Sequence, residues 1–477
     1  MKKPLDLTIA DQLEALAIAI AMALVLKFFL VEAYEIPSGS MQPTILGDPG
    51  TGIFDRVLAD KLTTMLRAPR RWEVMIFRFP NDERALYVKR IVGLPGEKLA
   101  IRGGDVWVDD KIARKPDPVV DSVLKDVFRA DDGGIDLNVF SAGPGVRISG
   151  TRAEFAADAT GELTLRASVR DDFLHGYDPS WGIQANDPGM RYAVADLEVS
   201  ADVLFGKLGE TNTPESRSPR TVKVGIESDE GMAEFEVAWG DSGGHASVAF
   251  RASNGEAPIV SQSRSNDEIL SYFGNFVGPG TPFRLLARSV DHELVLCIDG
   301  KEILRVPDDI SGARPAHPKK ALVHIGLTGG GTVSDVRLRR DIFYTPATQG
   351  DSTWDIPEGH YLALGDNTQG SLDSRGWKQR TLLLRPGSTH TADGTEVESW
   401  TGFDFDNPRA PDANPHRLGG GQLAFANLHG DVIHVREADV VSQSLEPAPL
   451  IDQRYLLGKA VAVFWPVFHP FRWKLIR

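Results

Sequence analysis

DLEVSADVLF, residues 196–205, shows the repeat on which the fold of this chain depends. Its apolar residues stand at every second position, so in an extended strand they share one face: Leu197, Val199, Ala201, Val203 and Phe205. The same period recurs in GMAEFEVAW, HASVAFRA and FRLLARSV, and ELVLCIDGKEILRV contains a hairpin turn at Asp299-Gly300. These segments predict an antiparallel β-sandwich or jelly roll within residues 113–350.

Composition supports a mostly β protein of more than one domain. The 477 residues include 47 glycines and 30 prolines, set among short apolar segments, which is typical of a turn-rich β chain. The net charge of −14 argues against a nucleic-acid-binding surface. Cys297 is the only cysteine, so no internal disulfide can form, and the eleven histidines show no metal-ligand spacing. We therefore expect no cofactor and no metal.

The N-terminal region contains the one strongly apolar run, ALAIAIAMALVLKFFLV, residues 15–31. As a helix rising ~1.5 Å per residue, it would cross most of a ~30 Å hydrocarbon core. Lys2 and Lys3 precede it and favour a cytoplasmic N-terminus. This pattern predicts a single-pass protein of the cytoplasmic (inner) membrane, with everything after residue 31 on the outer, periplasmic face. A cleaved signal peptide is the alternative, because Val31-Glu32-Ala33 loosely fits a cleavage site.

A candidate nucleophile follows this run, in IPSGSMQPT, residues 36–44, which offers Ser38 and Ser40. The simpler interpretation is an ordinary polar turn. No histidine occurs in the first 170 residues to serve as a base. Lys89 can serve if burial lowers its pKa, since alternation places it on the same strand face as Tyr87 and Ile91. The alternative for Lys89 is an exposed or ion-paired lysine.

Three segments in chain order resemble the catalytic boxes of the type I signal peptidases, which are membrane-bound Ser/Lys endopeptidases. They are IPSGSMQPT, YVKRIVGLPGE and GDNTQGSLDSRGW. RRWEVMIFRFP is similar to the strand between the first two boxes, although Trp72-Glu73 replaces the family's usual glycine-aspartate pair. The similar segments cover less than half of the chain.

This resemblance implies a role for each matching residue. Ser40 would be the nucleophile and Lys89 its general base. Ser38 would donate its hydroxyl to the oxyanion, together with the backbone N–H of Ser40. Ser371 would hydrogen-bond the Lys89 amine and orient it.

The resemblance also implies a set of supporting residues around these four. Gly365, Asp366 and Asn367 would shape the turn that bears Ser371, and Asp373 and Arg375 would form a supporting ion pair. The aspartates in such turns usually cap backbone amides, so neither need be a catalytic acid.

Two further residues complete the prediction. Arg90, beside the base, would be structural, and Met41 would face the membrane or the substrate. The implied substrates are exported preproteins, whose signal peptides have small residues at −1 and −3. The implied surroundings include the lipid bilayer, while nucleic acid is not an expected partner.

Changes in the residue pattern along the chain predict a division into successive segments. We expect a cytoplasmic N-terminus and anchor at 1–33, a first catalytic part at 34–112, the inserted sandwich at 113–350, a second catalytic part at 351–380, a loop-rich insertion at 381–425, and C-terminal catalytic strands with an interfacial tail at 426–477. For the tail, an ordinary strand with a solvated end is the equal alternative.

The inserted segment leaves two other functions open. Its strand rhythm is weakly similar to concanavalin-like lectin and laminin-G sandwiches, so it could bind a glycan or a protein, with the peptidase part vestigial. A structural spacer is as reasonable. A related Ser/Lys protease that cleaves itself or a regulator is the third possibility, and such proteins lack an N-terminal anchor.

Overall fold

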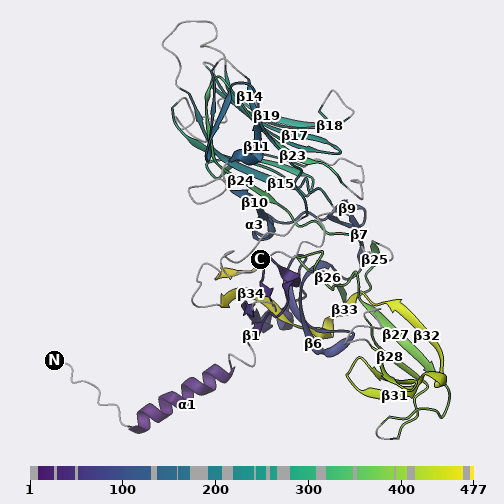
Figure 1. Cartoon of the computed structure of the whole chain (residues 1–477). Coiled ribbons are helices and arrows are strands. Elements are labelled where there is room, and N and C mark those ends of the chain that lie inside the picture. The colour runs from purple at the N-terminus through teal and green to yellow at the C-terminus, as the bar shows by residue number, and fades with distance from the viewer. Residues whose placement is uncertain are drawn as a thin grey trace. The chain divides into compact units, whose positions relative to one another are not determined.

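The computed structural model describes most of the chain. The described residues are 9–25, 30–48, 52–129, 137–157, 160–171, 192–206, 219–240, 243–253, 258–265, 280–307, 318–346, 352–391, 394–404, 414–465 and 473–477. They divide into two compact units (Figure 1). The first unit contains the described residues up to Leu99 and those from 352 onward, and the second contains those from Ala100 to Pro346.

The main sheet of the first unit brings together strands that are far apart in the sequence. Its order is β1-β4-β34-β5-β6-β26-β33, and β35 pairs with β34. The strands are β1 (Val31–Glu35), β4 (Arg56–Asp60), β34 (Leu456–Trp465), β5 (Val74–Phe79), β6 (Asp82–Gly93), β26 (His360–Leu364), β33 (Leu450–Asp452) and β35 (Lys474–Leu475). A short helix, α2 (Lys61–Leu66), follows β4 and begins at Asp60, whose carboxylate accepts from the Thr63 N–H.

Two apolar clusters stabilise this sheet. The first packs Ile36 and Met41 with the strand residues Val57, Val74 and Ile76. The second gathers aromatic side chains around Trp377, including Phe77, Phe79 and Tyr361. Together they hold the Ser40 turn, β6 and the turn after β26 in one packed body.

Residues 378–447, which include the segment predicted to be loop-rich, contain two small sheets. One has the order β28-β27-β32 and the other β29-β30-β31. The strands are β27 (Lys378–Leu384), β28 (Ser399–Phe403), β29 (His416–Gly419), β30 (Gln422–Ala426), β31 (Val432–Arg436) and β32 (Val440–Pro447). Leu382, Phe425 and Val435 belong to the apolar cluster between them.

The N-terminal helix has the 17 residues of the apolar run but begins six residues earlier than that run. α1 spans Ile9–Val25, and Val31, which the prediction placed at the end of the apolar helix, instead begins strand β1. Lys27 lies outside the described residues. In the part of the chain that the structure describes, no helix has both the length and the hydropathy needed to cross a membrane.

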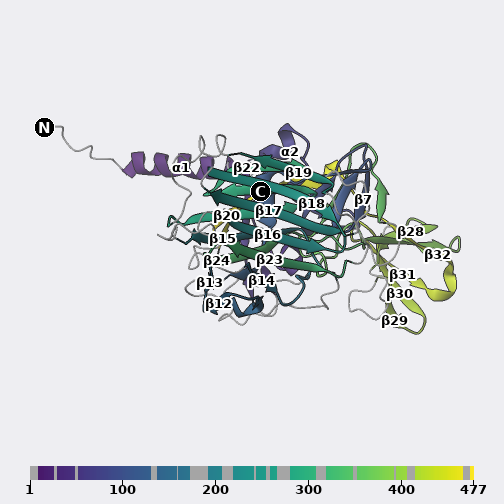
Figure 2. The same cartoon turned by 90° about the horizontal axis from the view of Figure 1, so that it is seen from above.

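The second unit confirms the predicted sandwich pattern. One sheet has the order β12-β13-β24-β15-β20-β21-β22, with β10 also paired to β24, and the other has the order β11-β14-β23-β16-β17-β18-β19. Figure 2 shows β23, β16, β17 and β18 side by side. One apolar core draws side chains from both sheets, among them Val199 of β15 and Phe235 of β17. The predicted mostly β class is therefore confirmed.

The sandwich strands have the following bounds: β10 (Lys125–Arg129), β11 (Phe140–Ala142), β12 (Val146–Ser149), β13 (Arg152–Phe155), β14 (Gly161–Leu165), β15 (Leu197–Phe205), β16 (Arg220–Ser228), β17 (Gly231–Gly240), β18 (Gly243–Ala252), β19 (Val260–Arg264), β20 (Phe283–Val290), β21 (Glu293–Ile298), β22 (Lys301–Pro307), β23 (Ala321–Thr328) and β24 (Gly331–Arg340). The helix α3 spans Asp117–Val123, and β7 (Lys98–Arg102) and β8 (Asp105–Val108) precede it.

Candidate active site

The two serines of residues 36–44 lie at a single turn of 3₁₀ helix, Gly39–Met41. Ser38 occupies the extended position before the turn and is exposed, whereas Ser40 is buried. Their Oγ atoms are 3.3 Å apart. Gln42, directly after the turn, donates a hydrogen bond from Nε2 to the Gly47 carbonyl and so stabilises the turn. The local sequence thus presents two hydroxyls of different accessibility at one point.

Lys89 reaches this turn from strand β6. Its Nζ donates a hydrogen bond to Ser40 Oγ at 2.6 Å, and its side chain is almost fully buried. Burial lowers the pKa of Lys89 to about 8, although the negative charges of Asp373 and Asp366 oppose the shift. About a tenth of the amine is then neutral at pH 7, compared with less than a thousandth for a free lysine. A neutral amine at this distance can accept the serine proton.

The aromatic ring of Tyr87 lies next to the Lys89 amine and packs with two further aromatic rings. The ammonium lies 5.3 Å from the centre of the Tyr87 ring, which itself stacks on Phe79 at 4.4 Å. Trp377 contacts both rings edge-on. The ring nearest the Lys89 amine is therefore an aromatic one, which supplies no carboxylate to hold its proton.

Arg90, the next residue of β6, lies fully buried in an ion pair with Asp366. Its Nε and Nη2 donate to the two carboxylate oxygens at 2.8 and 2.7 Å, and Nη1 donates to the Trp72 carbonyl. Asp366 also accepts from Thr44 Oγ1 at 2.5 Å. This pair ties β6 to the end of the Ser40 turn, in keeping with a structural position for Arg90. Thr44 belongs to the predicted serine motif, but the resemblance assigned it no role.

Gly365 and Asn367 contact the Ser40 turn directly. The Asn367 backbone N–H donates to the Ser40 carbonyl, and its Nδ2 donates to the Gly39 carbonyl, both at 3.1 Å. A Cβ on Gly365 would lie 2.5 Å from the Ser40 carbonyl oxygen and 2.2 Å from Ser371 Oγ. Only glycine permits this close approach of the two turns.

Ser371 is placed beside the site without the contact that we predicted. In the described part of the chain its Oγ is buried and has no hydrogen-bond partner, so it makes no bond to the Lys89 amine. The Ser371 side chain instead packs against Gly365. The predicted orienting contact is therefore absent from this structure.

Asp373 and Arg375 form the expected ion pair. Arg375 Nε and Nη2 donate to the two carboxylate oxygens at 2.8 and 2.7 Å, and Gly365 N–H donates to the same carboxylate. Burial alone would raise the pKa of Asp373, but the charge and hydrogen bonds of Arg375 lower it overall. The carboxylate that faces Lys89 is thus already neutralised by an arginine.

The expectation for Met41 is wrong. Its side chain is fully buried and packs in the core with Ile45, Val57 and Val74, so it faces neither membrane nor substrate. The reason is the 3₁₀ turn, which directs Ser40 toward Lys89 and turns the following side chain into the core.

A cavity of about 410 Å³ opens beside the two serines. Pro37, Ser38 and Ser40 line it from the nucleophile turn, and Leu86 to Lys89 line it from β6. Leu372 contributes a further apolar wall. The volume falls within the range of small-ligand and peptide side-chain sites, ~300–1,000 Å³.

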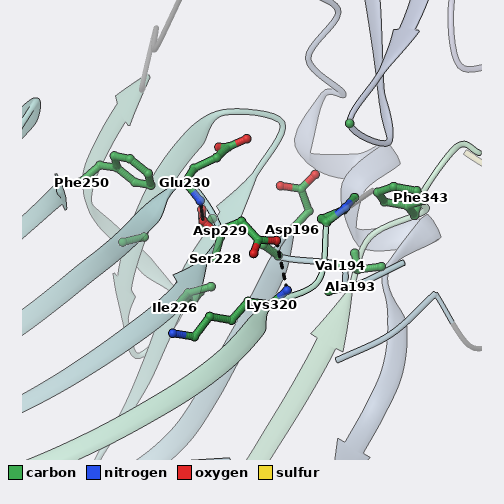
Figure 3. Close-up of a pocket in the computed structure, with 15 residues that line it drawn as sticks. Ala193, Val194, Asp196, Ile226, Ser228, Asp229, Glu230, Phe250, Lys320 and Phe343 are labelled. Atoms are coloured by element: carbon green, nitrogen blue, oxygen red, sulfur yellow. Dashed lines mark hydrogen bonds between the residues drawn. The ribbon is translucent and has the colours of Figure 1, made fainter. Parts of the chain in front are cut away.

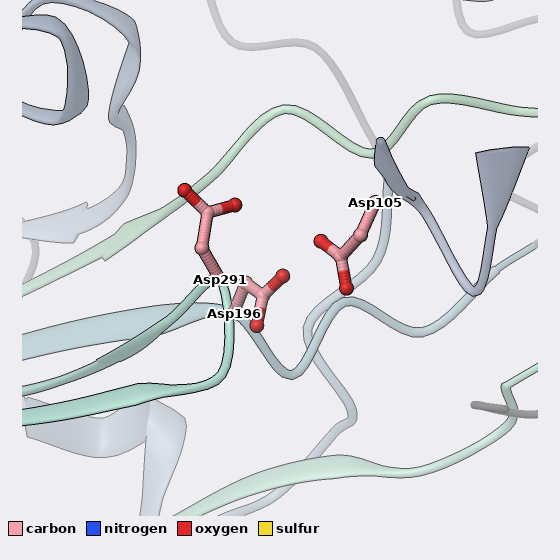
Figure 4. Close-up of side chains that lie close together, drawn as sticks. All are labelled: Asp105, Asp196 and Asp291. Atoms are coloured by element: carbon pink, nitrogen blue, oxygen red, sulfur yellow. The ribbon is translucent and has the colours of Figure 1, made fainter. Parts of the chain in front are cut away.

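The second unit contains a buried acidic cluster that no sequence motif indicated. Asp105, Asp196 and Asp291 each bring a carboxylate oxygen within 4.8 Å of the others (Figure 4). Lys115 enters the same cluster and pairs with Asp291 at 2.5 Å and Asp341 at 2.8 Å. Because a lysine already supplies positive charge there, we assign no metal. The wide sequence spacing of the aspartates explains why no motif was visible.

A small cavity adjoins this cluster at Asp196 (Figure 3). Its volume is about 30 Å³, enough for a water molecule but not for an organic ligand. The Lys320 backbone N–H donates to Asp229 along its rim at 3.1 Å. We therefore assign no ligand to it.

Comparison with known proteins relates the chain to the signal peptidases. Residues 9–129 and 295–387 match the family model "Signal peptidase, peptidase S26". Signal peptidase I of Rickettsia prowazekii (strain Madrid E) is 30% identical over 118 residues, which are 22% of this chain and 45% of that protein. Signal peptidase I of Pseudomonas fluorescens is 42% identical over 88 residues, 16% of this chain and 29% of that protein. The predicted resemblance is confirmed, and the chain spans less than half the length of these relatives.

Solved structures similar to the chain are β proteins at low overall similarity. The carbohydrate recognition domain of Emp46p in its potassium-bound form has a TM-score of 0.26 at 11% identity, covering 42% of this chain and 88% of that one. The carbohydrate-binding module CBM66 from Bacillus subtilis has a TM-score of 0.24 at 8% identity, covering 43% and 92%.

Proposed function

We propose that this chain, related in sequence to the type I signal peptidases, is a serine endopeptidase that removes signal peptides from exported preproteins. The observation that carries the proposal is the 2.6 Å hydrogen bond between a buried Lys89 amine and Ser40 Oγ. The two residues are 49 positions apart in the chain, and the fold brings their side chains together.

In the proposed mechanism, Ser40 Oγ attacks the scissile carbonyl carbon while its proton passes to neutral Lys89 Nζ. The developing oxyanion accepts hydrogen bonds from the Ser40 backbone N–H and the Ser38 hydroxyl. The protonated Lys89 then returns the proton to the leaving amine. A water molecule, deprotonated by Lys89, hydrolyses the acyl-enzyme and releases Ser40.

The cavity of about 410 Å³ supports a proposal for substrate binding. An extended signal peptide would lie along Leu86–Lys89, with its small −1 and −3 side chains in the shallow space beside Ser38 and Leu372. Ser371, whose buried Oγ has no partner among the described residues, would turn toward Lys89 once substrate displaces water.

We also propose that the chain is anchored once in the cytoplasmic membrane, with the catalytic unit on the outer face. The apolar run at residues 15–31, with Lys2 and Lys3 before it, supports this orientation. The described side chains of α1 are exposed all round, including Leu16, Ile20 and Met22, as expected for a helix whose partner is lipid.

The alternative, a glycan- or protein-binding protein with a vestigial peptidase, would place the function in the second unit. The retained Ser40–Lys89 contact and the two arginine-aspartate pairs around it favour the peptidase.

The test is cleavage of a model preprotein by the full chain in detergent, with the new N-terminus mapped by mass spectrometry. Cleavage should follow a small residue and should disappear in Ser40→Ala. The exposed Ser444→Ala, on β32, is the matched control and should cleave like the unaltered chain. Undiminished cleavage by Ser40→Ala would overturn the proposal.

A further inference from the structure

The outward face of the seven-stranded sheet in the second unit carries a polar trench that is separate from the catalytic unit. The trench has a volume of about 520 Å³ and crosses β14, β23, β16, β17 and β18. Strand alternation directs its residues away from the sandwich core, since their neighbours Val224 and Phe235 are buried in it. The volume is that of an organic ligand site.

Two glycines in the middle of strands open this trench. Gly225 lies between His324 and Glu234 in the register, and Gly326 lies between Glu162 and Lys223. Glycine weakens a strand interior, so two glycines at paired-strand positions need an explanation.

Neither packing nor backbone conformation provides that reason. A Cβ on Gly326 would meet only the Gly161 carbonyl at 3.6 Å, which is an ordinary contact. A Cβ on Gly225 would meet Sδ of the flexible Met232 side chain at 3.0 Å and Cβ of His324 at 3.4 Å, which a small shift of Met232 accommodates. Neither glycine is among those with positive φ. What the two glycines do is leave the floor of the trench open to an approaching ligand.

The charged groups of the trench are paired within the face. Glu236 pairs with Lys223 at 2.8 Å, Glu234 with Arg251 at 2.7 Å, and Glu162 with His324 at 2.8 Å. Each carboxylate thus has a basic partner on the same face. A strongly anionic or cationic ligand would gain little there and would compete with an existing pair.

The hydrogen-bonding capacity of the face identifies the ligand class. Carboxylate acceptors alternate with guanidinium, ammonium and imidazole donors over a floor of glycine, Met232 and Ala249. A sugar hydroxyl both donates and accepts, so it can bond to both members of such a pair. A peptide would find no free backbone partner on a sheet face, because the ladder uses those groups. We propose that this trench binds a neutral oligosaccharide, lying over Gly225 and Gly326.

The test uses the full chain in lauryldimethylamine oxide, which has no sugar headgroup to compete. An array carries neutral di- to tetrasaccharides, with sialylated glycans, sulfated glycans and unstructured peptides as separate arms. The chain should retain one or more neutral glycans and neither of the other classes. Retention of the anionic or peptide arm alone, or of nothing, would overturn the proposal.

Variants place the binding in the trench. Gly326→Val adds a side chain to its floor at a strand position that tolerates one, and should weaken binding of the retained glycan by about tenfold or more. His324→Ala adds no bulk and should weaken binding as well. Ala238→Val, on the same face but outside the trench, is the matched control and should bind like the unaltered chain.

Equal affinity in Gly326→Val, His324→Ala and the control would also overturn the proposal. Preprotein cleavage, measured on the same preparations, should not change in any of the three. The glycan proposal and the peptidase proposal can therefore fail separately.

Discussion

Lys89 in the first unit and Lys115 in the second are both buried lysines, yet their surroundings drive their pKa values in opposite directions. Lys89 Nζ contacts a serine hydroxyl and an aromatic ring, and burial lowers its pKa to about 8. Burial would also lower the pKa of Lys115, but Asp291 and Asp341 in direct contact raise it well above its ordinary value. A buried amine therefore becomes a base only where no carboxylate touches it.

The aspartates near Lys89 show how this condition is met. Asp366 is bound by Arg90 and Asp373 by Arg375, each through two hydrogen bonds. The two carboxylates still raise the pKa of Lys89, but burial and the charge of Arg375 lower it by more. Lys115, by contrast, contacts the carboxylates of Asp291 and Asp341 directly.

The largest expected effect is the loss of activity when the Lys89 amine is removed. Lys89→Met keeps an apolar stem of similar length and should lower preprotein cleavage by roughly 10⁴-fold or more, because Ser40 loses its base. The melting temperature should not fall, since a desolvated amine is replaced by an apolar group. Activity within tenfold of the unaltered chain would contradict the assigned role.

The same substitution at Lys115 should act on stability. Lys115→Met would leave the carboxylates of Asp291 and Asp341 buried without their cation, at a cost of about 3–5 kcal/mol. Hydrogen exchange followed by mass spectrometry should show faster exchange in the strands of the second unit. Unchanged exchange there would mean that the ion pairs contribute little.

The pH dependence of cleavage provides a third test. Cleavage needs neutral Lys89, so kcat/KM should rise about tenfold for each pH unit below 8 and level off above it. The sign follows from the role of the group as a base, which is active only after it loses its proton. A flat profile between pH 6 and 8 would exclude Lys89 as the titrating base.

The smallest effect is expected from placing a carboxylate next to the Lys89 amine, as Lys115 already has. Tyr87→Glu would place a carboxylate beside Nζ, raise the pKa of Lys89 and move the rise of the pH profile upward by about one unit, lowering cleavage several-fold at pH 7. Tyr87→Gln has the same shape without the charge and is the matched control. Equal profiles for the two variants would show that contact with a carboxylate is not what separates the two lysines.

The sequence predicted much of the site because its chemistry lies in short motifs. Ser38, Ser40 and Lys89 stood out as candidates by residue type and position, and the resemblance of three ordered segments to the type I signal peptidases implied their roles and the Asp373–Arg375 pair. Met41 was placed wrongly, because its direction depends on a single 3₁₀ turn that residue type does not reveal. The Ser371 contact was predicted and is absent, since a motif does not specify a side-chain rotamer.

The amino-acid sequence by itself determined the strand periodicity, the apolar N-terminal run and the candidate residues Ser40 and Lys89, because each is a local pattern. Only the tertiary structure decided which buried lysine has a lowered pKa, because that depends on contacts between residues far apart in the chain, such as Arg90 with Asp366 and Lys115 with Asp341. The trench over Gly225 and Gly326 has the same origin: its floor and walls come from strands that meet only in the folded sheet.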